Sequence, residues 1–184
     1  MRLFIAVQID PEIRKRIAKW TRTFHYRLLK AVFSPEKNIH ITLRFLGSTD
    51  RETADEVIRR LTPVYSEIPG FEVRFRGGGA FPRASRPRVI FVHPDRGRET
   101  VCDLARRTEK ALSGLFPPEK RTFRAHATSA RVKKVFNAKA VREMIESAAE
   151  LDFGAQTVTG ISLVKSDLRR SGARYSELHR WELK

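Results

Sequence analysis

Cysteine is almost absent from this chain of 184 residues, and because Cys102 stands alone, no disulfide can form within the chain. Asparagine, glutamine and methionine are also scarce, with two residues of each, whereas 32% of the residues are charged. This balance is expected where thermolabile residues are disfavoured, as in thermophiles. No cluster has the spacing of zinc ligands, and a single cysteine removes the commonest structural zinc sites. We therefore expect neither a metal nor a cofactor.

Long apolar runs are missing as well. No stretch approaches the length of a membrane-spanning helix, and the short apolar run near the N-terminus meets Asp10 and Pro11 too early for a signal peptide. We expect a cytoplasmic protein with no membrane partner. The length suits a single domain over residues 1–184, and we expect it to be a monomer.

Acidic residues are outnumbered by basic ones, 21 against 37, which gives a formal charge of +16. Such a charge attracts polyanions and steers their approach, so it favours a nucleic-acid partner, although a charge-rich surface without that role has the same composition. The stretch from Arg74 to Arg88 interleaves aromatic residues with arginines. It is typical of a rim that binds single strands, and equally of a solvated loop.

Apolar periodicity predicts an α+β protein with largely antiparallel sheets. The three consecutive glycines from Gly77 to Gly79 lack the Gly-Lys-Ser/Thr sequence of a phosphate-binding loop and predict a tight turn. A proline at position 63 should kink or shorten the second helix. The expected helices cover residues 11–24, 54–68, 101–115 and 137–149, and the expected strands lie near residues 3–9, 39–46, 71–75, 88–92, 157–165 and 175–183.

One tripeptide pattern occurs twice, as His40-Ile41-Thr42 and as His126-Ala127-Thr128. On a strand, the period of two places histidine and threonine on the same face. Two imidazoles can serve as general base and general acid, and two hydroxyls can donate hydrogen bonds to phosphoryl oxygens between them. Because so short a pattern arises readily by chance, the surrounding sequence has to decide whether it carries function.

That surrounding sequence contains M-R-L-F-I-A-V at the start, H-I-T-L-R-F-L-G around the first motif, and G-G-G-A-F-P followed by R-P-R-V-I-F-V in the middle. The second motif and a late S-G-A-R-Y come after these in order. In these segments the chain resembles the two-histidine (2H) phosphoesterase superfamily, and within it the RNA 2′,3′-cyclic phosphodiesterases, also known as 2′-5′ RNA ligases. The resemblance runs nearly from end to end.

The resemblance implies two pseudo-symmetric lobes of sheet with outer helices around a central cleft. It also implies a metal-independent enzyme that opens RNA 2′,3′-cyclic phosphates to 2′-phosphate ends, and whose reverse reaction forms a 2′-5′ linkage without ATP. Its partner would be single-stranded RNA or tRNA-derived ends. Two alternatives stay open: a 2H phosphoesterase of small cyclic nucleotides or ADP-ribose cyclic phosphate, and a non-catalytic RNA-binding module.

Within that resemblance, His40 and His126 are the acid and base, in an order that the sequence does not assign. Thr42 and Thr128 would hold the phosphate oxygens, although threonine is also common as a plain strand residue. Two departures stand out at the second motif. Proline commonly precedes that histidine and a bulky apolar residue commonly follows the threonine, whereas this chain has Ala125 and Ser129. The late segment L-V-K-S-D-L-R-R-S-G also carries more charge than is typical.

Four further residues are candidates for substrate binding. Phe45 and Arg131 each stand five residues after a motif histidine, where the family contacts substrate. An odd offset in an ideal strand points away from the histidine, so a bend or bulge would be needed there. Arg44 shares the face of the first histidine by parity, although an arginine in solvent fits equally well. Arg124 could stack on a base or pair with phosphate. For Tyr175 we favour a core position over one lining the cleft.

Overall fold

The computed structural model describes residues 1–169 and 172–184. The predicted S-G-A-R-Y motif and the charged late segment therefore lie partly outside the described residues, because both include Ser171. Four helices are interspersed among nine strands in the described residues. The strands are β1 (Arg2–Gln8), β2 (Leu29–Phe33), β3 (His40–Ser48), β4 (Phe71–Phe81), β5 (Val89–Pro94), β6 (Ala127–Val135), β7 (Asp152–Val158), β8 (Gly160–Arg169) and β9 (Gly172–Glu182). The helices are α1 (Pro11–Thr21), α2 (Arg51–Tyr65), α3 (Arg98–Ala111) and α4 (Ala138–Glu146), with a 3₁₀ turn at Glu36–Asn38.

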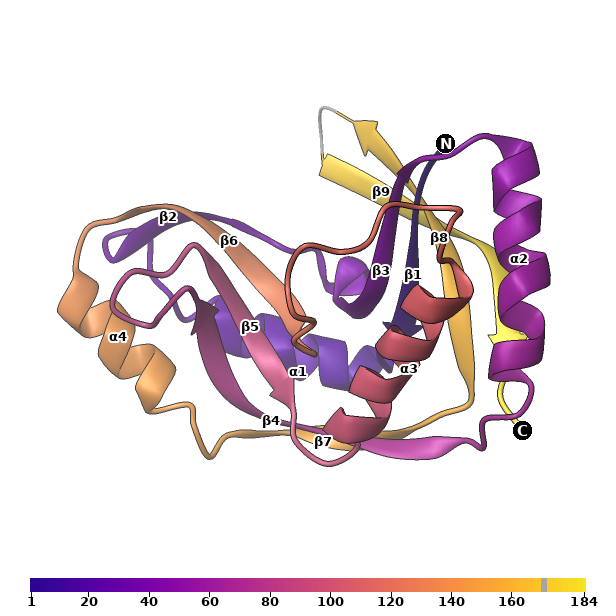
Figure 1. Ribbon diagram of the computed structural model, residues 1–184. Coiled ribbons are helices and arrows are strands. Elements are labelled where there is room, and N and C mark those ends of the chain that lie inside the picture. The colour runs from indigo at the N-terminus through magenta and orange to yellow at the C-terminus, as the bar shows by residue number, and fades with distance from the viewer. Residues whose placement is uncertain (170–171) are drawn as a thin grey trace.

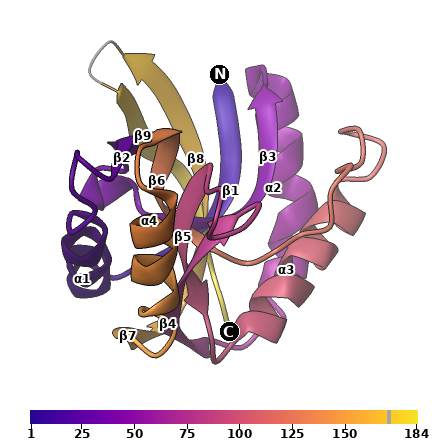
Figure 2. The same cartoon turned by 90° about the vertical axis from the view of Figure 1, so that its left-hand side faces the viewer.

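One sheet runs through both halves of the chain in the order β7-β4-β5-β6-β3-β1-β8-β9, with β2 paired to β6. Each of these pairings is antiparallel, which confirms the predicted α+β class. Figures 1 and 2 show α2 beside α3 at one end of the molecule and α4 near the opposite end. No helix of the described residues has the length and apolar character that a membrane crossing requires.

The sheet has two halves, β7-β4-β5-β6 and β3-β1-β8-β9. Helices α1 and α3 each follow a strand of one half and pack against the other half. Helix α1 follows β1 in the sequence yet packs against β6 and β7, whereas α3 follows β5 yet packs against β3. This exchange requires apolar faces on both helices, which Ile13 and Ile17 supply in α1 and Val101 and Leu104 supply in α3. The helices thereby hold the two halves of the sheet together.

Strand β1 is buried on both faces, and its two faces have different partners. Leu3, Ile5 and Val7 point into the main core under the helices, where each is fully buried. Phe4 and Ala6 point to the other face, where they pack with Val164 and Tyr175. The strand therefore separates the helix-covered core from the face that carries the two motif histidines.

Helix boundaries follow ordinary capping chemistry. The Asp50 side chain accepts a hydrogen bond of 2.7 Å from the backbone N–H of Thr53 and so caps α2. Pro11 occupies the first turn of α1, where its missing N–H costs nothing. Pro63 lies in the last turn of α2, and the helix ends two residues later at Tyr65.

The triple glycine is not a tight turn, and that prediction is wrong. Gly77, Gly78 and Gly79 lie inside β4. A Cβ at Gly78 would lie 2.6 Å from the ring of Trp20, and one at Gly79 would lie 2.7 Å from His93 and from Phe91. Gly78 and Gly79 are needed because aromatic and imidazole rings approach this strand too closely for a side chain, whereas Gly77 has a φ of +81° and a Cβ there would lie 2.9 Å from the carbonyl oxygen of Ala149. The predicted strand near 157–165 is divided into β7 and β8, and β2 was not predicted.

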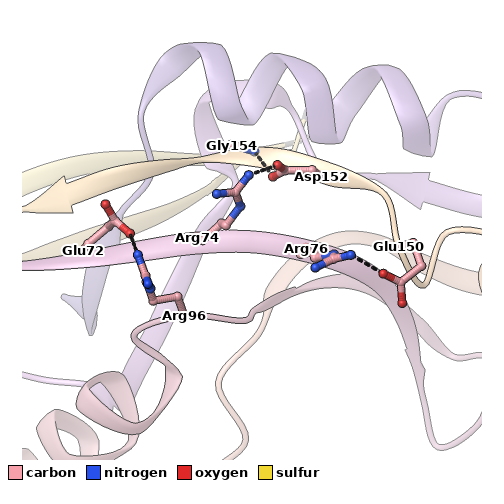
Figure 3. A network of polar contacts seen from close by, with 7 residues as sticks. All are labelled: Glu72, Arg74, Arg76, Arg96, Glu150, Asp152 and Gly154. Atoms are coloured by element: carbon pink, nitrogen blue, oxygen red, sulfur yellow. Dashed lines mark hydrogen bonds and ion pairs between the residues drawn. The ribbon is translucent and has the colours of Figure 1, made fainter.

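Ion pairs join the outer strand β7 to β4 (Figure 3). Arg74 of β4 pairs with Asp152 of β7, whose carboxylate also accepts a hydrogen bond of 3.0 Å from the Gly154 N–H. Beside it, Arg76 pairs with Glu150. Arg96 pairs with Glu72 at 3.1 Å. The guanidinium of Arg74 holds the pKa of Asp152 below its ordinary value.

We expect the Arg74–Asp152 ion pair to contribute little to the free energy of unfolding, because both side chains are exposed to solvent. In a double-mutant cycle with Arg74→Ala and Asp152→Ala, the coupling energy should be small in low salt and should shrink further in 1 M NaCl. Urea unfolding of the four proteins measures it. A coupling energy unchanged by salt would show that the pair does not act through its charges.

Candidate active site

A single backbone pairing brings the two tripeptides together. Ile41 of β3 pairs with Ala127 of β6, and both are fully buried. Because neighbouring residues of a strand point to opposite faces, the residues on either side point the other way. We call the side of the sheet to which they point the histidine face. It carries four half-buried residues, His40, Thr42, His126 and Thr128. Strand β6 begins at Ala127, so His126 immediately precedes the strand.

The antiparallel register sets His40 opposite Thr128 and Thr42 opposite His126. The two histidines are therefore diagonal neighbours, which in antiparallel sheets lie about 7–8 Å apart, with their Cβ atoms somewhat closer. Burial is the main cause that lowers the pKa of His40, and a positive charge on the neighbouring His126 lowers it further. Residues at positions 40 and 126, separated by 86 residues in sequence, thus share one small area of the sheet.

Both histidines have the same hydrogen bond behind the ring. The Nδ1 of His40 lies 2.7 Å from the carbonyl oxygen of Asn38, and the Nδ1 of His126 lies 2.6 Å from that of Arg124. Because a carbonyl oxygen only accepts, Nδ1 must carry the proton in each neutral ring. The lone pair is then on Nε2, which in His40 lies 2.9 Å from the Thr42 hydroxyl. Each half therefore presents a basic Nε2.

Each imidazole also lies between two aromatic rings. His40 stacks on Phe4 at 4.8 Å between ring centroids and meets the edge of Tyr175 at 5.4 Å. His126 meets Phe81 at 5.0 Å and Phe91 at 5.3 Å. The sequence pattern did not indicate the three phenylalanines, and it favoured a core position for Tyr175, which is instead half-buried beside the histidine. Strand pairing alone reveals these neighbours, because they come from four different strands.

Burial weakens both histidines as bases. It lowers the pKa of His40 to about 4, against the hydrogen bond to Asn38, which favours the charged ring, and the charges of His126 and Arg131 lower it further. Burial also lowers the pKa of His126, with the charge of Arg131 acting in the same direction. Both rings are therefore neutral at pH 7. A phosphate anion between them would favour protonation and raise both pKa values.

Two bulges bring Phe45 and Arg131 onto the histidine face. In β3 the pairing with β1 skips one residue after Thr42, and in β6 the pairing with β5 skips one residue after Thr128. The extra residue is the third after the histidine in both strands. Each bulge reverses the parity of the later residues in its strand, so the required bulge is present twice. Phe45 is 56% exposed, and its ring centroid lies 5.9 Å from that of Phe4.

Arg44 does not lie on the histidine face, and that prediction is wrong. The bulge in β3 turns its side chain into the opposite, buried face, where only 5% is exposed. There it pairs with Glu109 of α3, lies 3.5 Å from Glu119, and donates a hydrogen bond to the carbonyl oxygen of Pro117. Its role is to fasten α3 and the following loop to β3.

Arg124 and His93 lie beside His126. The Arg124 guanidinium lies 5.9 Å from the centre of the Phe81 ring, and the side chain is exposed. The ring of His93 meets that of Phe91 at 4.9 Å between centroids. Burial is the main cause that lowers the pKa of His93, followed by the charges of Arg98 and His126. The second half of the face thus carries a third imidazole.

The two departures from the family pattern lie in the buried side of the second motif. Ala125 belongs to the core, and Ser129 is the bulged residue, with its hydroxyl donating a hydrogen bond of 3.2 Å to the carbonyl oxygen of Ile90. Both are therefore turned away from the four motif side chains. Within residues 1–169 and 172–184, no group of three or more His, Cys, Asp or Glu could hold a metal ion.

The family model described as LigT like Phosphoesterase matches this chain twice, over residues 7–91 and residues 92–175. The chain belongs to this family. The first match contains His40 and the second contains His126. The hydrogen bond from Nδ1 to a backbone carbonyl and the bulge three residues after the histidine therefore occur once in each of two copies of one unit. The predicted resemblance to 2H phosphoesterases is confirmed.

Relatives in this family match over most of their length. The chain is 35% identical over 145 residues to an RNA 2′,3′-cyclic phosphodiesterase of Aeropyrum pernix, covering 78% of this chain and 81% of that protein. It is 32% identical to one of Archaeoglobus fulgidus, covering 99% and 100%. The crystal structure of TT0787 of Thermus thermophilus has a TM-score of 0.79 at 26% identity, covering 100% and 98%.

The low pKa of His40 predicts a pH-dependent stability. Because the unfolded chain binds this proton near pH 6.5 and the folded protein only near 4, the free energy of unfolding should fall as pH drops through this window, by about 3 kcal/mol at most from this residue. Urea unfolding at a series of pH values measures it. His40→Gln should reduce the fall. An equal fall in the variant would place the pH dependence elsewhere.

Proposed function

We propose that this protein is an RNA 2′,3′-cyclic phosphodiesterase that leaves 2′-phosphate ends. One observation carries the proposal: two histidines, clamped in the same tautomer, present Nε2 on one face as diagonal neighbours. That arrangement matches a reaction in which one group removes a proton and another donates one across a single phosphorus atom. The names of the relatives at 28–35% identity support the same reaction.

In the proposed reaction, one neutral histidine accepts a proton from water through Nε2, and the oxygen of that water attacks phosphorus. The bond from phosphorus to the 3′-oxygen breaks. The other histidine, protonated while the anionic phosphate is bound, gives its proton to the departing 3′-oxygen. A 2′-phosphate and a 3′-hydroxyl result, and the two histidines exchange protonation states. With an RNA 5′-hydroxyl in place of water as the nucleophile, the same steps form a 2′-5′ linkage without ATP.

The remaining residues of the face have matching roles in this proposal. The hydroxyls of Thr42 and Thr128 would donate hydrogen bonds to the non-bridging oxygens, which gain charge as phosphorus becomes five-coordinate. Arg131 would offset that charge, since its own charge already acts on both histidines. The exposed ring of Phe45 is suited to stacking on a base, and Arg124 is suited to pairing with phosphate.

RNA is the favoured substrate over small cyclic nucleotides because of the +16 charge and the names of the relatives. A non-catalytic module is not supported, since the family is one of phosphoesterases and both motifs are complete. The cytoplasmic location and the monomeric state stay predictions.

The reaction is tested by incubating the protein with an oligoribonucleotide that ends in a 2′,3′-cyclic phosphate, and separately with cyclic mononucleotides, in excess EDTA. We expect 2′-phosphate ends and undiminished rates, because two imidazoles supply the proton transfers without a Lewis acid. Mass spectrometry together with digestion by a 3′-specific phosphatase identifies the ends. Activity lost on chelation and restored by zinc or manganese would sink the metal-free mechanism.

Replacing either motif histidine should remove most of the activity. For His40→Ala and His126→Ala we expect kcat to fall by about 10²–10⁴-fold each, and the double variant to be little worse than either, because acid and base act as a unit. Single-turnover rates measure this. His25→Ala is the control, because His25 is exposed and lies outside both motifs. Losses that simply multiply in the double variant would contradict a shared site.

A further inference from the structure

Beyond the catalytic residues, β6 carries the histidine face outward along its pairing with β2 (Figure 1). Val32 pairs with Arg131, and Lys30 pairs with Lys134. Lys133 is the extra residue of a bulge between these two pairs. We call this the basic ribbon, which consists of the exposed residues Lys30, Val32, Arg131, Lys133 and Lys134.

The register fixes which way the ribbon faces. Leu29, Ala31 and Val132 pack into the core under α1 and α4. Lys30 and Val32 alternate with these and therefore lie on the opposite face, together with their partners Arg131 and Lys134. That is the face of the motif histidines, since the bulge after Thr128 returns Arg131 to it. The ribbon is a direct continuation of the candidate active site.

No acidic residue offsets the positive charges of the ribbon within its two strands. Neither residues 29–33 nor residues 127–135 contain Asp or Glu. None of its four cations forms an ion pair within the described part of the chain, whereas arginines elsewhere, such as Arg74 and Arg106, are paired with carboxylates. Lys30 and Lys134 even lie directly opposite each other, an arrangement of like charges that is unfavourable in a sheet. A bound polyanion would offset that cost.

Lysines on an outer strand can also serve to prevent pairing with other chains. That reason accounts for Lys30 on β2. It does not account for the remaining three cations, because they lie on β6, which already pairs with β2. Their shared feature is instead their position, which begins at Arg131 beside both histidines and runs about 10 Å outward along the strand.

We propose that the basic ribbon binds the phosphates of the RNA chain that leads to the cyclic end, so that the enzyme takes single-stranded oligonucleotides in preference to mononucleotides. This inference rests on the proposed function and adds to it the path of the substrate. The terminal nucleotide lies at the histidines, with Phe45 on the β3 side. The preceding nucleotides follow β6 and β2 away from the site.

The test compares a long and a short substrate with the triple variant Lys30→Gln, Lys133→Gln and Lys134→Gln. For an eight-residue RNA ending in a cyclic phosphate, we expect KM to rise by roughly tenfold in low salt, because phosphate contacts supply most non-specific affinity. For 2′,3′-cyclic UMP, KM should change less than about twofold. The slope of log KM against log salt for the long RNA should fall by about 0.7 for each lost contact.

A matched control removes the same charge from elsewhere. Lys15, Lys19 and Lys110 are exposed on α1 and α3, which cover the other face of the sheet, and their replacement by Gln should leave both KM values unchanged. Equal effects of the two triple variants would overturn the ribbon and show a dependence on net charge alone. An equal rise in KM for both substrates, or no rise for either, would also overturn it.

Binding is measured in parallel by fluorescence anisotropy of a labelled eight-residue RNA with a 3′-phosphate, which requires no turnover. A tenfold rise in Kd for the ribbon variant, with an inactive parent protein, would support the ribbon and reject the proposed reaction. Turnover of cyclic ends with an unchanged Kd would do the reverse. The two proposals can therefore fail separately.

Discussion

The arrangement of the candidate site depends on one backbone pairing, that of Ile41 with Ala127. The apolar side chains of Ile41 and Ala127 are fully buried. Their burial places the flanking histidines and threonines on the other face. A shift of the register by one residue would turn all four into the core. The exchange of α1 and α3 between the two halves protects this register, because each helix packs on strands of the other half.

The shared face of the four motif residues could be predicted because a period of two applies locally, within three consecutive residues. The period of two failed beyond Thr42, where the first bulge in β3 begins. Arg44 was expected beside His40, yet the bulge turned it toward Glu109, while Phe45 took the position that parity had assigned to Arg44. A bulge is defined by the partner strand, so the sequence of β3 alone could indicate only that one was needed.

The surroundings of the histidines could not be predicted for a similar reason. Phe4, Phe81 and Phe91 come from separate strands, and only the order of strands in the sheet brings them to the imidazoles. The glycines of β4 were read as a turn because their local signal is the same. Gly78 and Gly79 instead make room for the rings of Trp20, Phe91 and His93, and Gly77 supplies a positive φ beside the carbonyl oxygen of Ala149. Such long-range contacts leave no local pattern.

The carbonyl clamps on the two imidazoles have a consequence for the direction of catalysis. Since each Nδ1 proton is held by the carbonyl oxygen of the residue two positions earlier, both rings are left in the same tautomer, with the lone pair on Nε2. In the proposed reaction, either Nε2 can therefore accept or donate the proton. Microscopic reversibility requires the two histidines to exchange these roles between the forward and the backward reaction, and a shared tautomer fits that exchange. Under that proposal, the nucleophile alone decides the outcome: water opens a cyclic end, and a 5′-hydroxyl joins two ends.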